Sequence, residues 1–346
     1  MIFMNSGRGV TAYHGPVLPT GLYPESPPWR THALAVSHGH VLHVEESGDP
    51  AGICAVVLHG GPGSGSSPLL RRFFDPARYR VIAIDQRGAG RSRPRGATAH
   101  NSTADLLDDL RHVREQLEVP RWLVAGGSWG ATLALAYAAF EPRAVAALLL
   151  RAVFLPRTED IEAFFQDTDG RAPSAWARFA SVAPAEERHD MLGFLARGLL
   201  NASSGDLPRR LAVAWWRWEQ TLARGTALRN EEPTPSEPDG AMLDALVDRY
   251  RVQSHYLQHR CWLDAPPLLD RLGALPQVPT LLLHSRDDGI CRPEGAQAVH
   301  GRIAHSQLRW VVGAGHDPSH PAMASAMVAA LDSYARHGHF AGGLAP

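Results

Sequence analysis

Lysine is absent from this sequence of 346 residues, so arginine supplies all 34 of its strongly basic side chains. Pyridoxal enzymes need a lysine to form their Schiff base. The GxxxxGK[ST] phosphate loop needs a lysine to reach the nucleotide phosphates. The absence of lysine therefore excludes two large classes of enzyme.

Cysteine is also scarce. The sequence has 3 cysteines, Cys54, Cys261 and Cys291, which are widely spaced and form no CxxC pair. An odd number of dispersed cysteines argues against a disulfide framework and against a zinc site, so we expect no metal and a reduced, cytoplasmic setting. The N-terminus has no basic segment followed by an apolar one, and secretion is therefore not indicated.

A surplus of charge and long apolar runs are missing as well. The formal net charge is -1, and no basic excess indicates a nucleic-acid partner. The longest apolar runs, such as Ala144–Leu150, are far too short to cross a bilayer, so we expect no membrane partner. A hydrophobic fraction of 45% is typical of a globular protein with a sizeable core, built as one large domain with an insertion or as two ordinary domains.

Short apolar strands alternate with helical segments in two parts of the chain. Residues 32–48 alternate apolar and polar side chains on both sides of "SHGH", which predicts a hairpin. Buried strands are then predicted in "ICAVVLHG", "YRVIAIDQ", "RWLVAGG", "RAVAALLL", "PTLLLH" and "LRWVVG". Because helices such as 104–117 separate these strands, the pattern indicates an α/β fold whose mostly parallel central sheet is covered by helices on both faces.

The rhythm of strands breaks between about Arg157 and Ala274. There the chain is helical, rich in tryptophan and interrupted by the loop "NEEPTPSEPDG" at 230–240. A helical insertion between two halves of one sheet explains this break. We therefore predict a core formed by residues 30–156 and 275–340, a helical cap at 157–274 for substrate recognition, and an irregular lead-in at 1–29.

The segment "GGSWG" at Gly126–Gly130 fits the G-x-S-x-G pattern of a nucleophile elbow. An apolar strand precedes it and an apolar helix follows, and its glycines allow the sharp turn that presents the Ser128 hydroxyl at the carboxyl edge of the sheet. The alternative is an ordinary strand-to-helix turn with serine as the N-cap. The presence of a base and an acid elsewhere in the chain favours the elbow, because a serine hydroxyl needs them to become a nucleophile.

Candidates for the base and the acid follow the last two strands. His316 comes directly after the last strand, and Asp287 and Asp288 come at the end of the strand before it. The order serine, aspartate, histidine is that of α/β-hydrolases. The sequence therefore predicts Ser128 as the nucleophile, His316 as the base, and one of the two aspartates as the acid that orients the base.

A tetrahedral oxyanion needs two backbone N–H donors. One donor is expected from Trp129, the residue after the nucleophile. The other is expected from "HGGPG" at His59–Gly63, a glycine-rich loop after an earlier strand, with Gly61 as our choice and Gly60 as the alternative. The chain thus contains each part that a serine hydrolase requires.

These motifs resemble the proline iminopeptidase (prolyl aminopeptidase) family of α/β-hydrolases. The resemblance is carried by "LHGGPG", "RRFFDPARYRVIAIDQRGAGRS", "GGSWGATLALAYA", "LLLRAVFLPR", "WRWE", "RDDGIC" and "GAGH", which span roughly residues 40–320. It implies an α/β-hydrolase fold with an inserted helical cap. It also implies an enzyme without a cofactor that removes an N-terminal residue, typically proline, from peptides.

The resemblance implies roles for single residues as well. Alignment with the family's acid loop makes Asp288 the catalytic acid. It places Phe154 and Cys291 beside the apolar subsite for the first side chain of the substrate. The alternative for Cys291 is a small buried residue that fills space.

A tryptophan-rich stretch of the cap matches the family's amine-binding pattern W-x-x-W-E. The match at Trp215–Glu219 implies that Glu219 holds the free α-ammonium of the substrate by a charge-assisted hydrogen bond, with Trp218 in the apolar wall around it. The alternative is a core helix with a stray acid. The family's second glutamate falls in a segment similar to "RIENHYF", where this chain reads "RVQSHYL" and has Gln253. Losing that carboxylate is expected to weaken ammonium binding by about 1–3 kcal/mol.

We therefore predict a serine hydrolase that releases an N-terminal aminoacyl residue, proline or another small one, from an amide or peptide through an acyl-enzyme. Its partner is a short peptide or small molecule with a free N-terminal amine. The alternative, favoured by Gln253, is an amide hydrolase that removes a protecting aminoacyl group from a small-molecule intermediate in natural-product biosynthesis. A binding protein without activity on the same scaffold is expected to lack a member of the triad, and none is missing here.

Overall fold

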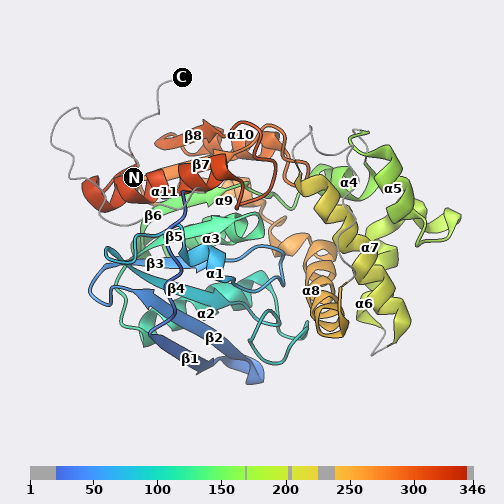
Figure 1. The fold of residues 1–346 in the computed structure, drawn as a ribbon, viewed down its shortest axis with the longest axis horizontal. Coiled ribbons are helices and arrows are strands. Elements are labelled where there is room, and N and C mark those ends of the chain that lie inside the picture. Colours follow the sequence, from blue (N-terminus) through green and yellow to red (C-terminus); the bar gives the residue numbers. More distant parts are fainter. Residues whose placement is uncertain (1–20, 168–169, 202–204, 225–237, 341–346) are drawn as a thin grey trace.

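The computed structural model describes residues 21–167, 170–201, 205–224 and 238–340. Most of the predicted lead-in at 1–29 and of the predicted loop at 230–240 lies outside these ranges. One sheet of 8 strands organises the fold, in the order β1-β2-β4-β3-β5-β6-β7-β8 (Figure 1). The strands are β1 (Arg30–Ala35), β2 (Val41–Gly48), β3 (Ile53–Leu58), β4 (Tyr79–Asp85), β5 (Trp122–Gly127), β6 (Val145–Arg151), β7 (Thr280–His284) and β8 (Ser306–Trp310).

Strands β3 to β8 run parallel, whereas β2 pairs antiparallel with both β1 and β4. The hairpin predicted at 32–48 is therefore confirmed, with Leu34 of β1 opposite Leu42 of β2. Each connection between parallel strands crosses from the carboxyl end of one strand back to the amino end of the next, so all the strands point the same way. All the carboxyl ends of β3 to β8 consequently meet at one edge, and the predicted catalytic motifs follow β3, β5, β7 and β8 there.

Both faces of the sheet are buried, as the continuous apolar strands indicate. Val56 of β3 packs in a cluster with helices α2 and α3, whereas the next residue, Val57, packs in a second cluster with α11. Successive side chains of a strand point to opposite faces, which explains the division. The helices of this core are α1 (Pro68–Arg71), α2 (Thr103–Gln116), α3 (Trp129–Phe140), α9 (Leu268–Arg271), α10 (Pro293–Arg302) and α11 (Pro321–His337).

Five further α-helices in the described ranges form a cap with its own apolar cluster. Trp215 stacks on Tyr250 with a ring-centroid distance of 4.8 Å, and Trp218 stacks on Phe179 at 5.7 Å. In Figure 1 these helices lie together to one side of the sheet, with α8 nearest to the strands. Within the described ranges, no helix combines the length and the apolar character that a membrane span requires. The cap helices are α4 (Thr158–Gln166), α5 (Pro173–Ala180), α6 (Met191–Leu200), α7 (Asp206–Ala223) and α8 (Gly240–Gln258).

Helix α8 joins the cap to the core. Its residues Val252 and Tyr256 belong to the core cluster, whereas Tyr250 and Leu257 belong to the cap cluster. The hydroxyl of Tyr256 also donates to the side-chain oxygen of Asn101 at 2.8 Å. Helix α8 therefore lies at the boundary between cap and core, with side chains packed into both.

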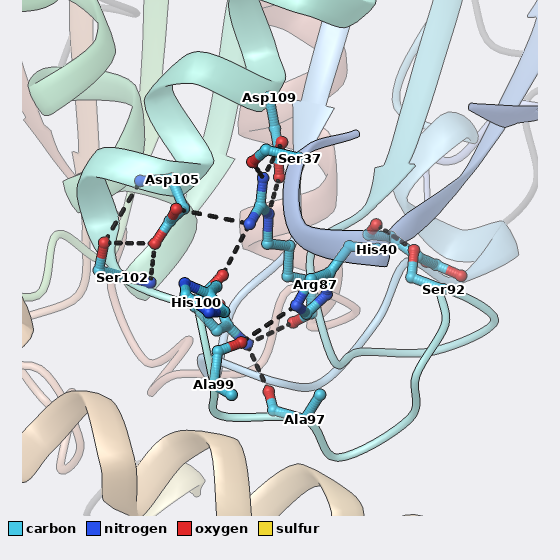
Figure 2. Close-up of polar contacts among 12 residues, drawn as sticks. Ser37, His40, Arg87, Ser92, Ala97, Ala99, His100, Ser102, Asp105 and Asp109 are labelled. Carbon is cyan, nitrogen blue, oxygen red and sulfur yellow. Dashed lines mark hydrogen bonds and ion pairs between the residues drawn. The ribbon is translucent and has the colours of Figure 1, made fainter. Parts of the chain in front are cut away.

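A buried arginine fixes the loop after β4 against α2 (Figure 2). The Arg87 guanidinium donates to both carboxylate oxygens of Asp109, each at 2.7 Å, to the carbonyl of His100 at 2.7 Å and to the hydroxyl of Ser37 at 2.7 Å. Such a bidentate pair is strong because the flat guanidinium matches the carboxylate. The same loop contacts α8, since a Cβ at Gly88 would lie 2.9 Å from the side chain of Val252.

We expect Arg87→Met to destabilise the protein by about 3–5 kcal/mol, because it leaves the carboxylate of Asp109 buried without its counter-charge. Arg111→Met is the matched control on the same helix as Asp109. The Arg111 side chain is 42% exposed and its partner Asp108 is 57% exposed, so this change is expected to cost about 1 kcal/mol or less. Urea denaturation of the two variants measures the difference, and equal midpoints would contradict the prediction.

Candidate active site

Ser128 lies in a strained turn between β5 and α3. Its φ of 57° and ψ of -124° are unusual for a residue with a side chain. The flanking glycines are required, because a Cβ at Gly126 would lie 2.2 Å from the carbonyl oxygen of Gly130, and one at Gly130 would lie 2.1 Å from that of Leu58. The turn therefore has the geometry of a nucleophile elbow, and the Ser128 side chain makes no N-cap hydrogen bond to α3.

His316 and Asp288 are hydrogen-bonded, with Nδ1 of the histidine 2.8 Å from Oδ2 of the aspartate. The other oxygen of Asp288 accepts from the backbone N–H groups of Ile290 at 2.9 Å and Cys291 at 2.8 Å. Burial by itself raises the pKa of this carboxyl, but the charge and hydrogen bond of His316, with smaller contributions from His284 and the Cys291 N–H, lower it to about 2. Of the two candidate acids, the structure brings Asp288 to His316.

Cys291 lies beside the nucleophile, with its Sγ 3.6 Å from Oγ of Ser128. Its Sγ, a carboxylate oxygen of Asp288 and a ring nitrogen of His316 all lie within 4.8 Å of one another. Burial raises the pKa of the Cys291 thiol well above its ordinary value, whereas a thiol ligates a metal as the thiolate. The three side chains therefore fit a histidine-aspartate pair with a protonated thiol next to it better than a metal centre.

The loop expected to hold the oxyanion is fixed by Gln86, which sequence reasoning missed. The backbone N–H of Gln86 donates to Nε2 of His59 at 3.0 Å, and its side-chain amide donates to the His59 carbonyl at 3.0 Å. The side-chain oxygen of Gln86 accepts from the indole of Trp129 at 2.9 Å. Because Nε2 of His59 accepts the Gln86 N–H, the ring is neutral and its Nδ1 donates to the carbonyl of Gly60 at 2.9 Å, and burial accordingly lowers the pKa of His59.

A small cavity opens onto Ser128 at the junction of cap and core. It encloses about 380 Å³ of space, including its open mouth, and both Gly61 and Ser128 line it. Gly61 therefore shares this space with the nucleophile, and Gly60 is also close to it, since a Cβ at Gly60 would lie 3.4 Å from Cβ of Ser128. The remaining lining is mainly apolar and comes from the loop after β6, the cap helices α4 and α8, and the acid loop: Phe154, Asp160, Ile161, Phe164, Phe165, Gln253, Leu257 and Ile290.

Comparison with known proteins assigns the family. A model of the alpha/beta hydrolase fold matches residues 56–321. A probable proline iminopeptidase from Leptolyngbya boryana is 36% identical over 316 residues, which cover 90% of this chain and 96% of the relative. A proline iminopeptidase from Xylella fastidiosa strain 9a5c is 37% identical over 317 residues, 90% of this chain and 99% of the relative. This chain belongs to the proline iminopeptidase family.

A solved structure agrees with this assignment at the level of the fold. The proline iminopeptidase-related protein from Thermus thermophilus matches with a TM-score of 0.55 and 22% identity, over 88% of this chain and 97% of that one. The α/β-hydrolase fold with a mostly parallel sheet and an inserted helical cap, predicted from the sequence, is therefore confirmed. As a member of the proline iminopeptidase family, the chain is a serine hydrolase.

Glu219, the acid of the family's W-x-x-W-E pattern, is buried and fully engaged. Its Oε2 accepts from the guanidinium of Arg249 at 2.5 Å and from the hydroxyl of Tyr250 at 2.9 Å, and its Oε1 accepts from the side-chain amide of Gln253 at 2.9 Å. Gln253 lines the cavity, whereas Glu219 does not. Trp218 is also absent from the lining, because its indole donates to the carbonyl of Phe164 at 2.9 Å and supports that residue from within the cap.

Two further residues at the site were missed by sequence reasoning. Asp160 lines the cavity and accepts from the guanidinium of Arg157 at 2.5 and 3.1 Å, and burial raises its pKa although Arg157 lowers it. The spacing of the two residues, i and i+3 across the start of α4, is the only signal of this pair in the sequence. Arg151, an arginine at the end of a buried apolar strand, donates to the carbonyl of His316 at 2.9 Å.

The loop that carries His316 is also attached to the cap. The backbone N–H of His316 donates to the carbonyl of Ala223, the last residue of α7, at 2.8 Å. Arg171 of the cap similarly donates to the carbonyl of Gly289, next to Asp288, at 2.8 Å. Both catalytic loops that follow the last strands therefore depend on the cap for part of their position.

Proposed function

We propose that this chain hydrolyses the bond between a small N-terminal aminoacyl group and an amine, releasing the amino acid through an acyl-enzyme. The observation that carries the proposal is the cavity at Ser128, which is lined mainly by apolar side chains and has the buried carboxylate of Glu219 behind its wall. The two relatives described above, which match this chain over nearly their whole length, are named as a probable proline iminopeptidase and a proline iminopeptidase, and this supports the same reaction.

In the proposed reaction, Ser128 Oγ attacks the carbonyl carbon of the aminoacyl group while His316 takes its proton. Asp288, ionised because its pKa is about 2, holds His316 in the tautomer whose other ring nitrogen is free to accept that proton. The backbone N–H groups of Gly61 and Trp129 bind the oxyanion. His316 then protonates the leaving amine, and a water molecule attacks the acyl-enzyme by the same steps in reverse order.

The cavity supports a substrate whose acyl part is small and apolar. Phe154, Phe164, Phe165 and Leu257 are among the apolar side chains that line it, and Cys291 lies next to Ser128. A prolyl or alanyl side chain would bury its carbon atoms there at about 25 cal/mol per Å² of apolar surface. The substrate amine would lie toward Gln253, the residue through which the cavity wall reaches Glu219.

A second candidate keeps this mechanism and changes the leaving amine. The family's second glutamate is replaced by Gln253, so the substrate is held by less negative charge than a general peptidase of the family would use. This favours an aminoacyl amide of a specialised small molecule, such as a protected intermediate of natural-product biosynthesis, whose leaving group contributes to binding.

The test is hydrolysis of prolyl- and alanyl-p-nitroanilide by the purified full chain, together with Glu219→Gln. We expect the wild type to release p-nitroaniline, and Glu219→Gln to lower kcat/KM roughly tenfold or more, since the change removes the negative charge behind Gln253 and leaves the Arg249 guanidinium without its counter-charge. Glu162→Gln, an exposed acid of the same cap, is the matched control and should change kcat/KM little. Negligible release from both anilides would overturn the peptidase function and favour the second candidate.

A further inference from the structure

The charge of Glu219 is already matched within the cap. The side chain of Glu219 is 7% exposed and that of its partner Arg249 is 26% exposed, so the carboxylate is the more deeply buried end of the ion pair. Burial opposes the charge on Arg249, but the Glu219 carboxylate outweighs it and raises the pKa of the guanidinium. The carboxylate and the guanidinium form an ion pair with an N···O distance of 2.5 Å, so the net charge of the pair is zero.

The residue between this pair and the cavity is neutral. Gln253 donates its side-chain amide to Oε1 of Glu219 at 2.9 Å, and this fixes which end of the amide is which, because a carboxylate can only accept. Its other end, Oε1, is buried and has no hydrogen-bond partner among the described residues. A buried acceptor without a partner is unfavourable, so a substrate N–H or O–H that reaches it is bound more tightly.

The other carboxylate at the cavity is paired as well. Asp160 lines the cavity, and both of its oxygens accept from the guanidinium of Arg157. Glu219 and Asp160 are therefore each in contact with an arginine. A protonated amine near Gln253 meets a neutral acceptor and carboxylates whose charge is opposed by a guanidinium.

We propose that Arg249 is a specificity-determining residue, because its charge cancels that of Glu219. The cavity then binds the hydrogen-bond donor of the substrate through the neutral oxygen of Gln253. As a result, the enzyme discriminates only weakly between a substrate with an ammonium group and one of the same size with a neutral donor. The inference rests on the proposed function. The substrate class it names comprises small α-aminoacyl groups together with their α-hydroxyacyl counterparts, whose hydroxyl donates to the same oxygen.

Substitutions at Arg249 and Glu219 can make the net charge of this ion pair negative, zero or positive. It is zero in the wild type, negative in Arg249→Met, positive in Glu219→Gln and zero again in the double variant. The measured quantity is the ratio of kcat/KM for L-alanyl- to L-lactyl-p-nitroanilide at one pH, which cancels any common effect on the triad. We expect Arg249→Met to raise this ratio roughly tenfold or more and Glu219→Gln to lower it, with the double variant near the wild type.

Arg251→Met is the matched control. It removes the same charge from the same helix, but the Arg251 guanidinium donates to the carbonyl of Leu199, on another helix of the cap, at 3.0 Å. Its ratio is expected to stay at the wild-type value. Arg249→Gln gives a second variant without the charge, in case Arg249→Met lowers the thermal midpoint of unfolding.

The outcomes separate the inference from the function on which it rests. If the wild type hydrolyses alanyl-p-nitroanilide and Glu219→Gln impairs it, but neither change at Arg249 raises the ratio, the inference is overturned and the proposed function stands. If the wild type hydrolyses neither anilide, both are overturned. The inference is supported if the ratio is highest in Arg249→Met, lowest in Glu219→Gln and similar in the wild type and the double variant.

Discussion

Ser128→Ala is expected to lower kcat/KM for alanyl-p-nitroanilide by about 10⁶, the scale on which serine hydrolases lose activity without their nucleophile. The elbow places the Ser128 side chain at the cavity, and the strained φ of 57° is already supplied by the surrounding glycines and strands. The variant should therefore fold as the wild type does. Steady-state kinetics and labelling with a fluorophosphonate probe measure the loss.

Cys291→Ala is the companion to this variant, because Sγ of Cys291 lies only 3.6 Å from Oγ of Ser128. Burial keeps the thiol protonated by raising its pKa, so it is a poor nucleophile in the wild type. We expect Cys291→Ala to be labelled by the fluorophosphonate on Ser128. An adduct on Ser128→Ala, or none on Cys291→Ala, would contradict the assignment of the nucleophile.

Asp288→Asn is expected to lower kcat by about 10⁴, because an amide in place of the carboxylate holds His316 in the wrong tautomer. The neighbouring Asp287→Asn is the matched control, since it removes the same charge one residue away. We expect it to keep most of the wild-type kcat. Equal losses in the two variants would mean that the acid acts through the charge of the loop and not through its hydrogen bond to His316.

The pH profile gives a second measure of Asp288. Its pKa is lowered to about 2, so its charge is present at every pH above its ordinary value of about 3.9 and is lost only as the pH falls toward 2. The acid limb of the wild-type kcat/KM profile above about pH 4 is therefore not set by Asp288.

Local patterns in the sequence were enough to predict the sheet and the catalytic loops. Buried parallel strands are continuous apolar runs, and the turns after them must use glycine where backbones approach closely, as at Gly126 and Gly130. Ser128, Asp288 and His316 each follow such a strand. Because parallel strands end at one edge, the positions of these residues after the strands were sufficient to predict that they lie at the same edge of the sheet.

The polar contacts of the cap could not be predicted in this way. Arg249 and Glu219 are 30 residues apart, on two helices whose pairing depends on how α7 and α8 pack. Trp215 and Glu219 lie one turn apart on α7 and are both buried, but this spacing says nothing of which cation would lie opposite. Gln86 was missed for the same reason, since its partners His59 and Trp129 come from two other loops.

The hydrogen bond from His316 to the carbonyl of Ala223 has a consequence for how such enzymes diversify. If the cap only covered the cavity, exchanging it between relatives would change the substrate specificity and leave the catalytic residues in place. Here the end of α7 supports the backbone of the general base. A cap taken from a relative must therefore also end a helix at this position. Otherwise the enzyme that receives it loses kcat as well as its original substrate specificity.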